Sequence, residues 1–212
     1  MLDLVVLLAF VPAVLAIVIS PGPDSIYTLT QSLSGGRAAG IAAGFGTATG
    51  VLVHTTAAVL GLSVILQTTA EAYIFVRYVG AAYLVYLGVK LVRSEETFDL
   101  SDGSGTRPQS LGESYRNALV INVANPQVAV FVLAFFPQFV PPSANATLQL
   151  SLLGIVYAGL SLLYLTVVAL FASRVRHRLL ESTVSRRVVR YLSGSVLVGF
   201  GLKLALEEQP TA

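Results

Sequence analysis

Residues 19–30 read ISPGPDSIYTLT, and they interrupt an otherwise apolar helix. The uncharged segment from Leu4 to Ile19 leads directly into Ser20-Pro21-Gly22-Pro23-Asp24, after which apolar residues resume. Proline cannot continue a helix, because it lacks the N–H group and clashes with the preceding turn, yet it is favoured at a helix start. The stretch therefore predicts that one half-helix ends here and a second begins, with Ser20 as the N-cap residue.

The composition indicates a membrane protein. Of the 212 residues, 55% are hydrophobic and 11% are charged, whereas soluble domains carry roughly 25% charged residues. A chain of this length cannot bury so much apolar surface in one aqueous core. A net charge of +2 and the lack of a basic-aromatic pattern argue against a nucleic-acid partner. The sequence has no cysteine and no catalytic or phosphate-binding motif, so we expect neither an enzyme nor a cofactor.

Six apolar segments are long enough to be transmembrane helices, since a span needs about 20 apolar residues. They are Leu4 to about Leu33, Ala38 to about Thr69, Tyr73 to Val92, Asn117 to Val140, Thr147 to Ser173 and Val188 to Leu206. Because Asp3 is the first charge and five more apolar segments follow, we interpret the first segment as a retained span, not a secretory signal.

A polar stretch divides these segments three and three. We therefore predict a first three-helix repeat (residues 1–93), a surface linker (94–116) and a second three-helix repeat (117–212). An odd number of spans per half makes such repeats inverted in the membrane. The predicted fold is an all-α membrane protein of six transmembrane helices, with broken first and fourth helices.

The positive charges predict the orientation, because cytoplasmic loops hold an excess of Lys and Arg. Most of the 13 such residues flank the first, third and fifth loops: Arg37; Lys90, Arg93, Arg107 and Arg116; Arg174, Arg176, Arg178, Arg186, Arg187 and Arg190. Both termini should therefore face outside, with the Arg-rich fifth loop (residues 174–190) in the cytoplasm.

The fourth segment contains a second interruption. Asn122 and the pair Asn125-Pro126 fall inside it, with Asn125 as a candidate N-cap. Interrupted helices in corresponding positions of two halves point to a transporter's binding site. About 17 residues precede the first break and about 9 the second, which leaves their relative depth open. The alternative is that each proline only kinks a helix.

Asp24 is the candidate for proton coupling. A carboxylate at mid-membrane depth is costly, by about 2.5–3.5 kcal/mol, and normally faces a cavity or a partner. Burial disfavours the charged form of a carboxyl group, which suits a group that gains and loses a proton. The alternative places Asp24 near the interface as a capping residue of the new helix.

Two further side chains are weaker candidates for substrate contact. His54 lies four residues after Gly50 on the same helix face, and a lone histidine of this kind serves either packing or binding. Tyr83 is able to line a pore or to anchor packing. Metal transport is not expected, because the only other histidine lies in the Arg-rich loop. The glycine-rich face of the second span fits packing within one monomer or between protomers, so a homo-oligomer stays open.

Several stretches together resemble the LysE-type amino-acid exporters, most closely the homoserine/threonine resistance branch. The resemblance rests on SPGPD (20–24), GGRAAGIAAGFGTATG followed by His54 (35–50), GAAYLVYLGVKLVRS (80–94), NPQVAVFVLAFFPQFV (125–140) and SGSVLVGFGLKLAL (193–206), in this order. Many members of that family carry an acidic residue where this chain has Val51. This departure leaves Asp24 as the candidate for proton coupling and argues against a cationic substrate.

The resemblance implies a multi-pass protein of the prokaryotic inner membrane that exports small amino acids using the proton gradient. Its implied partners are a neutral, homoserine- or threonine-like substrate, protons and the lipid bilayer. Ser20, Pro21, Gly22, Pro23, Asp24, Asn122, Asn125 and Pro126 are the expected substrate-binding positions, with His54 and Tyr83 as further candidates. The alternative function is a membrane interaction protein that does not transport and binds lipid or a partner through loop 174–190.

Overall fold

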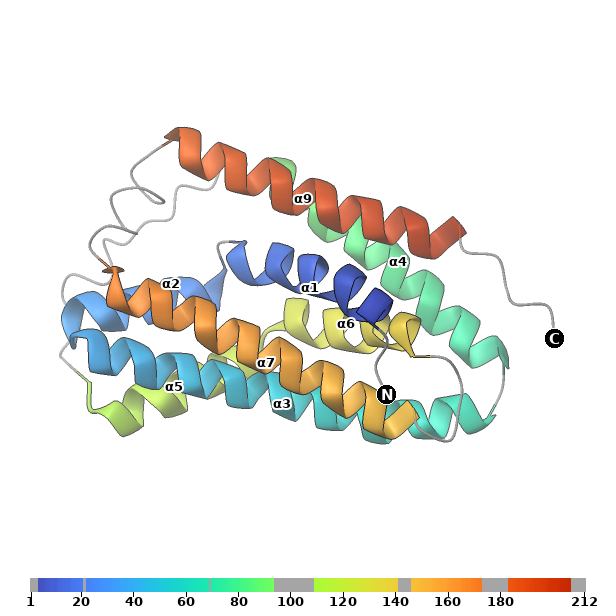
Figure 1. Cartoon of the computed structure of the whole chain (residues 1–212), viewed down its shortest axis with the longest axis horizontal. Coiled ribbons are helices and arrows are strands. Elements are labelled where there is room, and N and C mark those ends of the chain that lie inside the picture. The colour runs from blue at the N-terminus through green and yellow to red at the C-terminus, as the bar shows by residue number, and fades with distance from the viewer. Residues whose placement is uncertain are drawn as a thin grey trace.

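The computed structural model describes residues 4–20, 22–68, 70–93, 109–140, 146–172 and 183–206, and every regular element in these ranges is helical. The elements are α1 (Leu4–Ile19), α2 (Pro23–Ser34), α3 (Arg37–Thr68), α4 (Ala70–Arg93), α5 (Leu111–Val123), α6 (Pro126–Phe135), the short 3-10 helix η2 (Phe136–Phe139), α7 (Ala146–Leu170) and α9 (Thr183–Leu206). The predicted all-helical class is confirmed (Figure 1).

Both predicted helix breaks are present. Helices α1 and α2 meet at 56°, and α5 meets the α6–η2 segment at 58°. Helix α5 begins at Leu111 and not at Asn117, because Ser110 and Glu113 form a capping box just before the apolar run. The backbone N–H of Ser110 donates to Glu113 Oε2 at 2.8 Å, and the N–H of Glu113 donates to Ser110 Oγ at 3.2 Å. The expected linker 94–116 is therefore helical from residue 111.

The earlier start of α5 makes the two broken helices more alike than the sequence suggested. Sixteen residues precede the first break in α1 and 13 precede the second in α5. By length and composition, Arg37–Gly61 of α3 and Ala146–Leu170 of α7 are able to cross a membrane, as are the two bent pairs, which gives up to four spans in the described part of the chain. The six-span arrangement in two inverted repeats stays a prediction.

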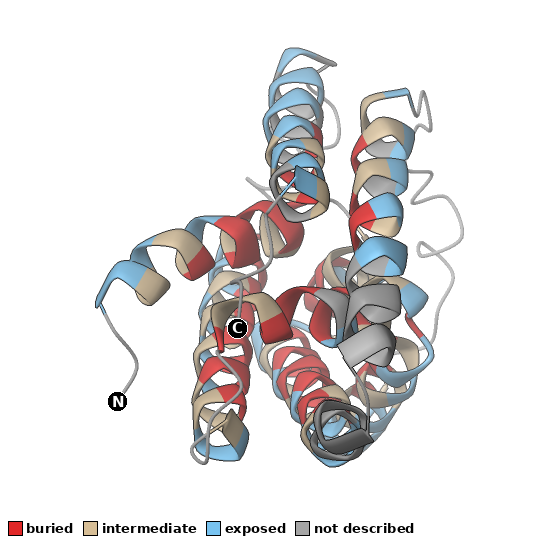
Figure 2. Ribbon diagram, turned by 90° about the vertical axis from the view of Figure 1, so that its right-hand side faces the viewer, coloured by how far each residue is buried: buried red, intermediate tan, exposed pale blue. Residues whose placement is uncertain are grey.

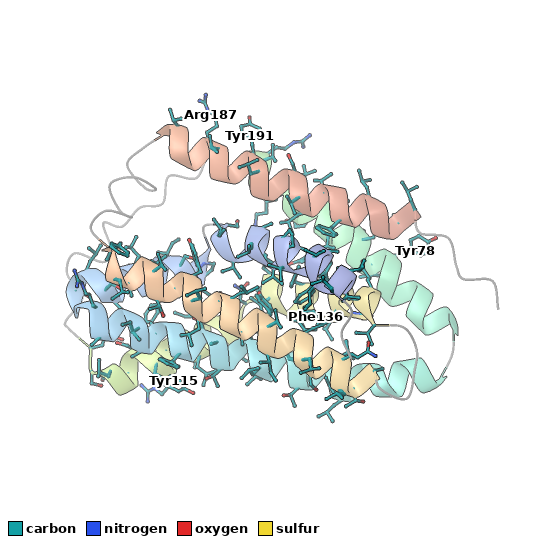
Figure 3. The ribbon with its side chains drawn as sticks, in the orientation of Figure 1. Tyr78, Tyr115, Phe136, Arg187 and Tyr191 are labelled. Atoms are coloured by element: carbon teal, nitrogen blue, oxygen red, sulfur yellow. The ribbon has the colours of Figure 1, made fainter. Side chains whose placement is uncertain are left out.

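The Arg-rich segment differs from its predicted form. Helix α9 begins at Thr183, so Arg186, Arg187 and Arg190 belong to its first turns, and not to a loop. Residues 173–182 lie outside the described residues. Figure 3 shows Arg187 and Tyr191 on the outer side of α9, directed away from the helices below.

The helices form two groups with a pair of half-helices between them. Helix α3 packs along α5, α7 and α2, while α4 packs along α9 (Figure 1). Helices α1 and α6 lie between these groups: α1 contacts α7 and α9, and α6 contacts α3 and α4. Figure 2 shows α1 passing from exposed residues near the N-terminus to buried residues where it meets the other helices.

Glycines allow close contact between helices of the same chain. A Cβ atom at Gly88 of α4 would lie 2.6 Å from the carbonyl oxygen of Gly194 in α9, and one at Gly46 of α3 would lie 3.0 Å from Ala118 Cβ in α5. Small residues at such crossings let two backbones approach in lipid. Gly46 of α3 therefore packs against α5 inside the monomer.

Candidate functional site

A small cavity lies where the two helix breaks come together. It is lined by the α1–α2 break, the α5–α6 break and the middles of α3 and α7. Its volume is about 40 Å³, enough for about three water molecules. The polar side chains around it include Asp24, Thr47, Asn122, Asn125, Tyr157 and Ser161. Two interrupted helices and two continuous ones thus line one cavity, and polar side chains form part of its wall.

Asp24 connects the two breaks. It lies in the first turn of α2, and its Oδ2 accepts hydrogen bonds from Asn122 Nδ2 at 3.1 Å and from Asn125 Nδ2 at 3.4 Å. The structure therefore brings together three residues that the sequence singled out separately. Both amides lie beside the α5–α6 break, so the carboxylate of the first broken helix is held by the second.

The start of α2 carries no side-chain cap. Gly22 is the N-cap, with φ −144° and ψ 178°, and Pro23 is the first helical residue. The prediction of Ser20 as the N-cap is therefore wrong, because Pro23 at the first position places the cap at residue 22. Ser20 is buried in the bend and lines the cavity instead, and Pro21 lies outside the described residues. The first N–H groups of α2 lack partners within the helix.

The start of α6 is capped as predicted. Asn125 Oδ1 accepts a hydrogen bond from the N–H of Gln127 at 3.0 Å, and Pro126 is the first helical residue. The same side chain thus caps α6 with its oxygen and binds Asp24 with its nitrogen.

The two roles of Asn125 can be separated by substitution. Serine retains a capping oxygen but, like alanine, has no amide to donate to Asp24. We expect Asn125→Ser to unfold at a higher denaturant concentration than Asn125→Ala. The free energies of unfolding should differ by about 1 kcal/mol. Unfolding of the detergent-solubilised protein measures this. Equal stabilities of the two variants would show that the cap contributes nothing.

His54 and Tyr83 lie outside the cavity lining. His54 Nε2 donates to the backbone oxygen of Asn122 at 3.0 Å, which ties α3 to the end of α5. The ring of Tyr83 lies 6.0 Å from that of Tyr86 on the same helix. Val51, the position of the missing acidic residue, does line the cavity and is buried.

Sequence reasoning missed the contributions of α3 and α7. Thr47, Tyr157 and Ser161 are buried and line the cavity. Thr47 lies inside the glycine-rich motif, so its position was visible, but its orientation toward the site was not. Tyr157 and Ser161 are one helical turn apart on α7, a spacing that places them on one face.

The contacts on the two sides of the helix breaks differ in chemistry. Hydrogen bonds join α2 to α5 and to the residues just before it: Tyr27 Oη donates to Gln109 Oε1 at 2.8 Å, and Ser114 Oγ donates to Gln31 Oε1 at 3.2 Å. Asn117 Nδ2 of α5 also donates to Gln109 Oε1, at 3.1 Å. Beyond the breaks, between α1, α6, η2 and α7, the contacts are aromatic.

This aromatic cluster contains the largest buried side chains in the described part of the chain. Phe131 and Phe135 stack with centroids 4.6 Å apart, Phe10 meets Phe136 edge to face at 5.3 Å, and Tyr157 meets Phe131 at 5.5 Å. Figure 3 marks Phe136 within this region. The described residues contain no group of three or more His, Asp or Glu side chains suited to a metal ion.

Interrupted helices that meet around a half-buried carboxylate and a cavity lined in part by polar side chains are typical of secondary transporters. The comparison with known families agrees: the chain matches the LysE type translocator family over residues 15–208 and belongs to it. The resemblance seen in the sequence is thereby confirmed, and the chain is a membrane transport protein and not an enzyme.

Relatives extend over most of the chain. An uncharacterized membrane protein of Bacillus subtilis, YrhP, is 30% identical over 94% of this chain and 98% of its own length. The homoserine/homoserine lactone efflux protein of Salmonella typhimurium is 31% identical over 74% of this chain and 75% of its own. An uncharacterized membrane protein of Pseudomonas aeruginosa, PA4757, is 31% identical over 92% and 93%. No solved structure matches.

Proposed function

We propose that this translocator exports a small zwitterionic amino acid, similar to homoserine or threonine, in exchange for protons. The efflux protein of Salmonella typhimurium, whose name gives homoserine and homoserine lactone as substrates, supports the substrate class. The observation that carries the proposal is the position of Asp24 at the junction of the two breaks, bound to Asn122 and Asn125.

The site offers complementary groups for both charges of an amino acid. The substrate ammonium pairs with Asp24. The substrate carboxylate meets the uncapped start of α2, where free N–H groups and the helix dipole favour an anion. At the start of α6, Asn125 already occupies one N–H group, so α2 is the main anion site. Protonation of Asp24 weakens its hold on the ammonium and releases the substrate.

Transport requires the half-helices to separate, because a cavity of about 40 Å³ does not hold an amino acid. In the proposed orientation both termini face outside and the Arg-rich end faces the cytoplasm of a prokaryotic cell. The α2–α5 end then opens to load substrate from the cytoplasm, and the α1–α6 end opens to release it. Two inverted repeats would relate these movements.

Efflux from proteoliposomes tests the proposal. Vesicles are preloaded with labelled homoserine, threonine, lysine or glutamate, and the external pH is set above, equal to or below the internal pH. We expect homoserine and threonine to leave fastest when the external pH is below the internal pH, because the inward flow of protons then drives their export. Lysine and glutamate should be retained.

Two results would contradict the proposal in different ways. Efflux that ignores the pH gradient would remove the proton coupling but retain the exporter. If folded protein moves none of these amino acids, the exporter is wrong, and replacement of the arginines in 174–190 would then test the interaction-protein alternative.

A further inference from the structure

The hydroxyl group of Thr47 behaves differently from its neighbours on α3. Thr49, Thr55 and Thr56 each donate to the carbonyl oxygen four residues earlier, at 2.8–2.9 Å, the ordinary arrangement of threonine inside a helix. Thr47 is only 3% exposed, yet its Oγ1 has no hydrogen-bond partner in the described part of the chain. Thr47 lines the cavity.

Two other residues that line the cavity each have a buried oxygen without a hydrogen-bond partner in the described part of the chain. Asp24 uses Oδ2 to accept both asparagine amides, and its Oδ1 accepts nothing from the described residues. Asn122 is 1% exposed, and its Nδ2 is committed to Asp24, which fixes Oδ1 as the opposite, unpartnered atom. A buried acceptor without a donor destabilises a fold. Three around one cavity form a set of acceptors that suits a ligand with several donors.

We propose that Asp24 Oδ1, Asn122 Oδ1 and Thr47 Oγ1 together form a subsite for a primary ammonium group, and that Thr47 is a specificity-determining residue within it. A primary ammonium has three N–H donors, which match three oxygen acceptors, and the carboxylate balances its charge. This inference rests on the proposed function and adds the reason for selectivity: each methyl group on the nitrogen removes one donor and leaves one oxygen unpartnered.

Competition by N-methylated substrates tests the subsite. Efflux of labelled L-homoserine is measured with unlabelled L-homoserine, N-methyl-L-homoserine and N,N,N-trimethyl-L-homoserine as competitors. In the natural protein we expect the monomethyl compound to compete roughly tenfold to a hundredfold more weakly than homoserine, as for loss of one charge-assisted hydrogen bond. The trimethyl compound, with no N–H donor, should not compete.

The variant Thr47→Val has the same shape but lacks the third acceptor. We expect its half-saturating homoserine concentration to rise by about tenfold or more, while its preference for homoserine over the monomethyl compound shrinks to about threefold or less. Thr47→Ser restores the hydroxyl and should recover both values. Thr55→Val is the matched control, since Thr55 is buried on the same helix but bonds to its own backbone.

The results separate this subsite from the exporter proposal. If the natural protein moves no amino acid, the proposed function fails and the subsite with it. If it exports homoserine and folded Thr47→Val, eluting as a single peak in size-exclusion chromatography, keeps the full preference for the primary amine, the subsite alone is overturned.

Discussion

Asp24→Asn is expected to abolish gradient-driven efflux, lowering the initial rate by about a hundredfold or more, without unfolding the protein. The asparagine oxygen still accepts from the amides of Asn122 and Asn125, so the link between the two breaks survives. The negative charge does not survive. An ammonium group in the site then lacks its counter-ion, and removal of one partner from a buried ion pair costs about 3–5 kcal/mol. The initial rate under an imposed pH gradient is the measurement.

A matched carboxylate provides the control. Glu113 lies in the first turn of α5, where its side chain accepts from the backbone N–H of Ser110 on the exposed surface. Glutamine also accepts at that place, and we expect Glu113→Gln to export at the natural rate. If Asp24→Asn retained proton-driven efflux, the coupling role of the carboxylate would be refuted, whatever the behaviour of Glu113→Gln.

The second large effect is expected when Gly50→Ala adds one methyl group to α3. A Cβ at Gly50 would overlap Asn122 Oδ1 and lie 2.8 Å from Asn122 Cβ. Asn122 cannot yield without moving its amide away from Asp24. Overpacking of this kind destabilises by about 1–3 kcal/mol. We expect Gly50→Ala to lose at least about tenfold in efflux rate, because the Asp24 carboxylate loses one of its two amide donors.

Gly61, on the same helix, provides the control for this contact. Nothing lies within 4 Å of a Cβ built at Gly61. Replacing either Gly50 or Gly61 with alanine stabilises the helix itself by up to about 1 kcal/mol. Gly61→Ala should therefore be more stable than the natural protein and equally active. Thermal unfolding and efflux of the two variants are compared side by side. Equal activity in Gly50→Ala and Gly61→Ala would show that the fit at Asn122 is not needed.

The sequence was most informative where one local rule determines the backbone. Pro23 and Asn125-Pro126 predicted the two breaks, since proline and an asparagine cap act within one turn. The same rules contained signals that were overlooked. Pro23 at the first helical position implies a cap at Gly22 and not at Ser20, and Ser110-x-x-Glu113 marks the start of α5.

The rest of the site depends on how whole helices rotate and pair. Thr47 and Tyr157 face the cavity because α3 and α7 cross there, and no pattern within either helix specifies that face. Tyr83 does not line the cavity, and its helix α4 packs mainly along α9. Weak amphipathic patterns are expected in membrane helices, where lipid and protein interior are both apolar.

The contrast between the hydrogen-bonded contacts of α2 with α5 and the aromatic cluster makes the conformational cycle asymmetric. When water enters between α2 and α5, Gln31, Gln109 and Ser114 exchange each lost hydrogen bond for one to water, at little net free energy. When water enters beside Phe10 and Phe135, apolar surface is wetted, at about 25 cal/mol for each Å². Without substrate, the conformation that is open between α2 and α5 should therefore be the more populated one. Opening beside the phenylalanines, which releases the substrate, should be the slow step of turnover.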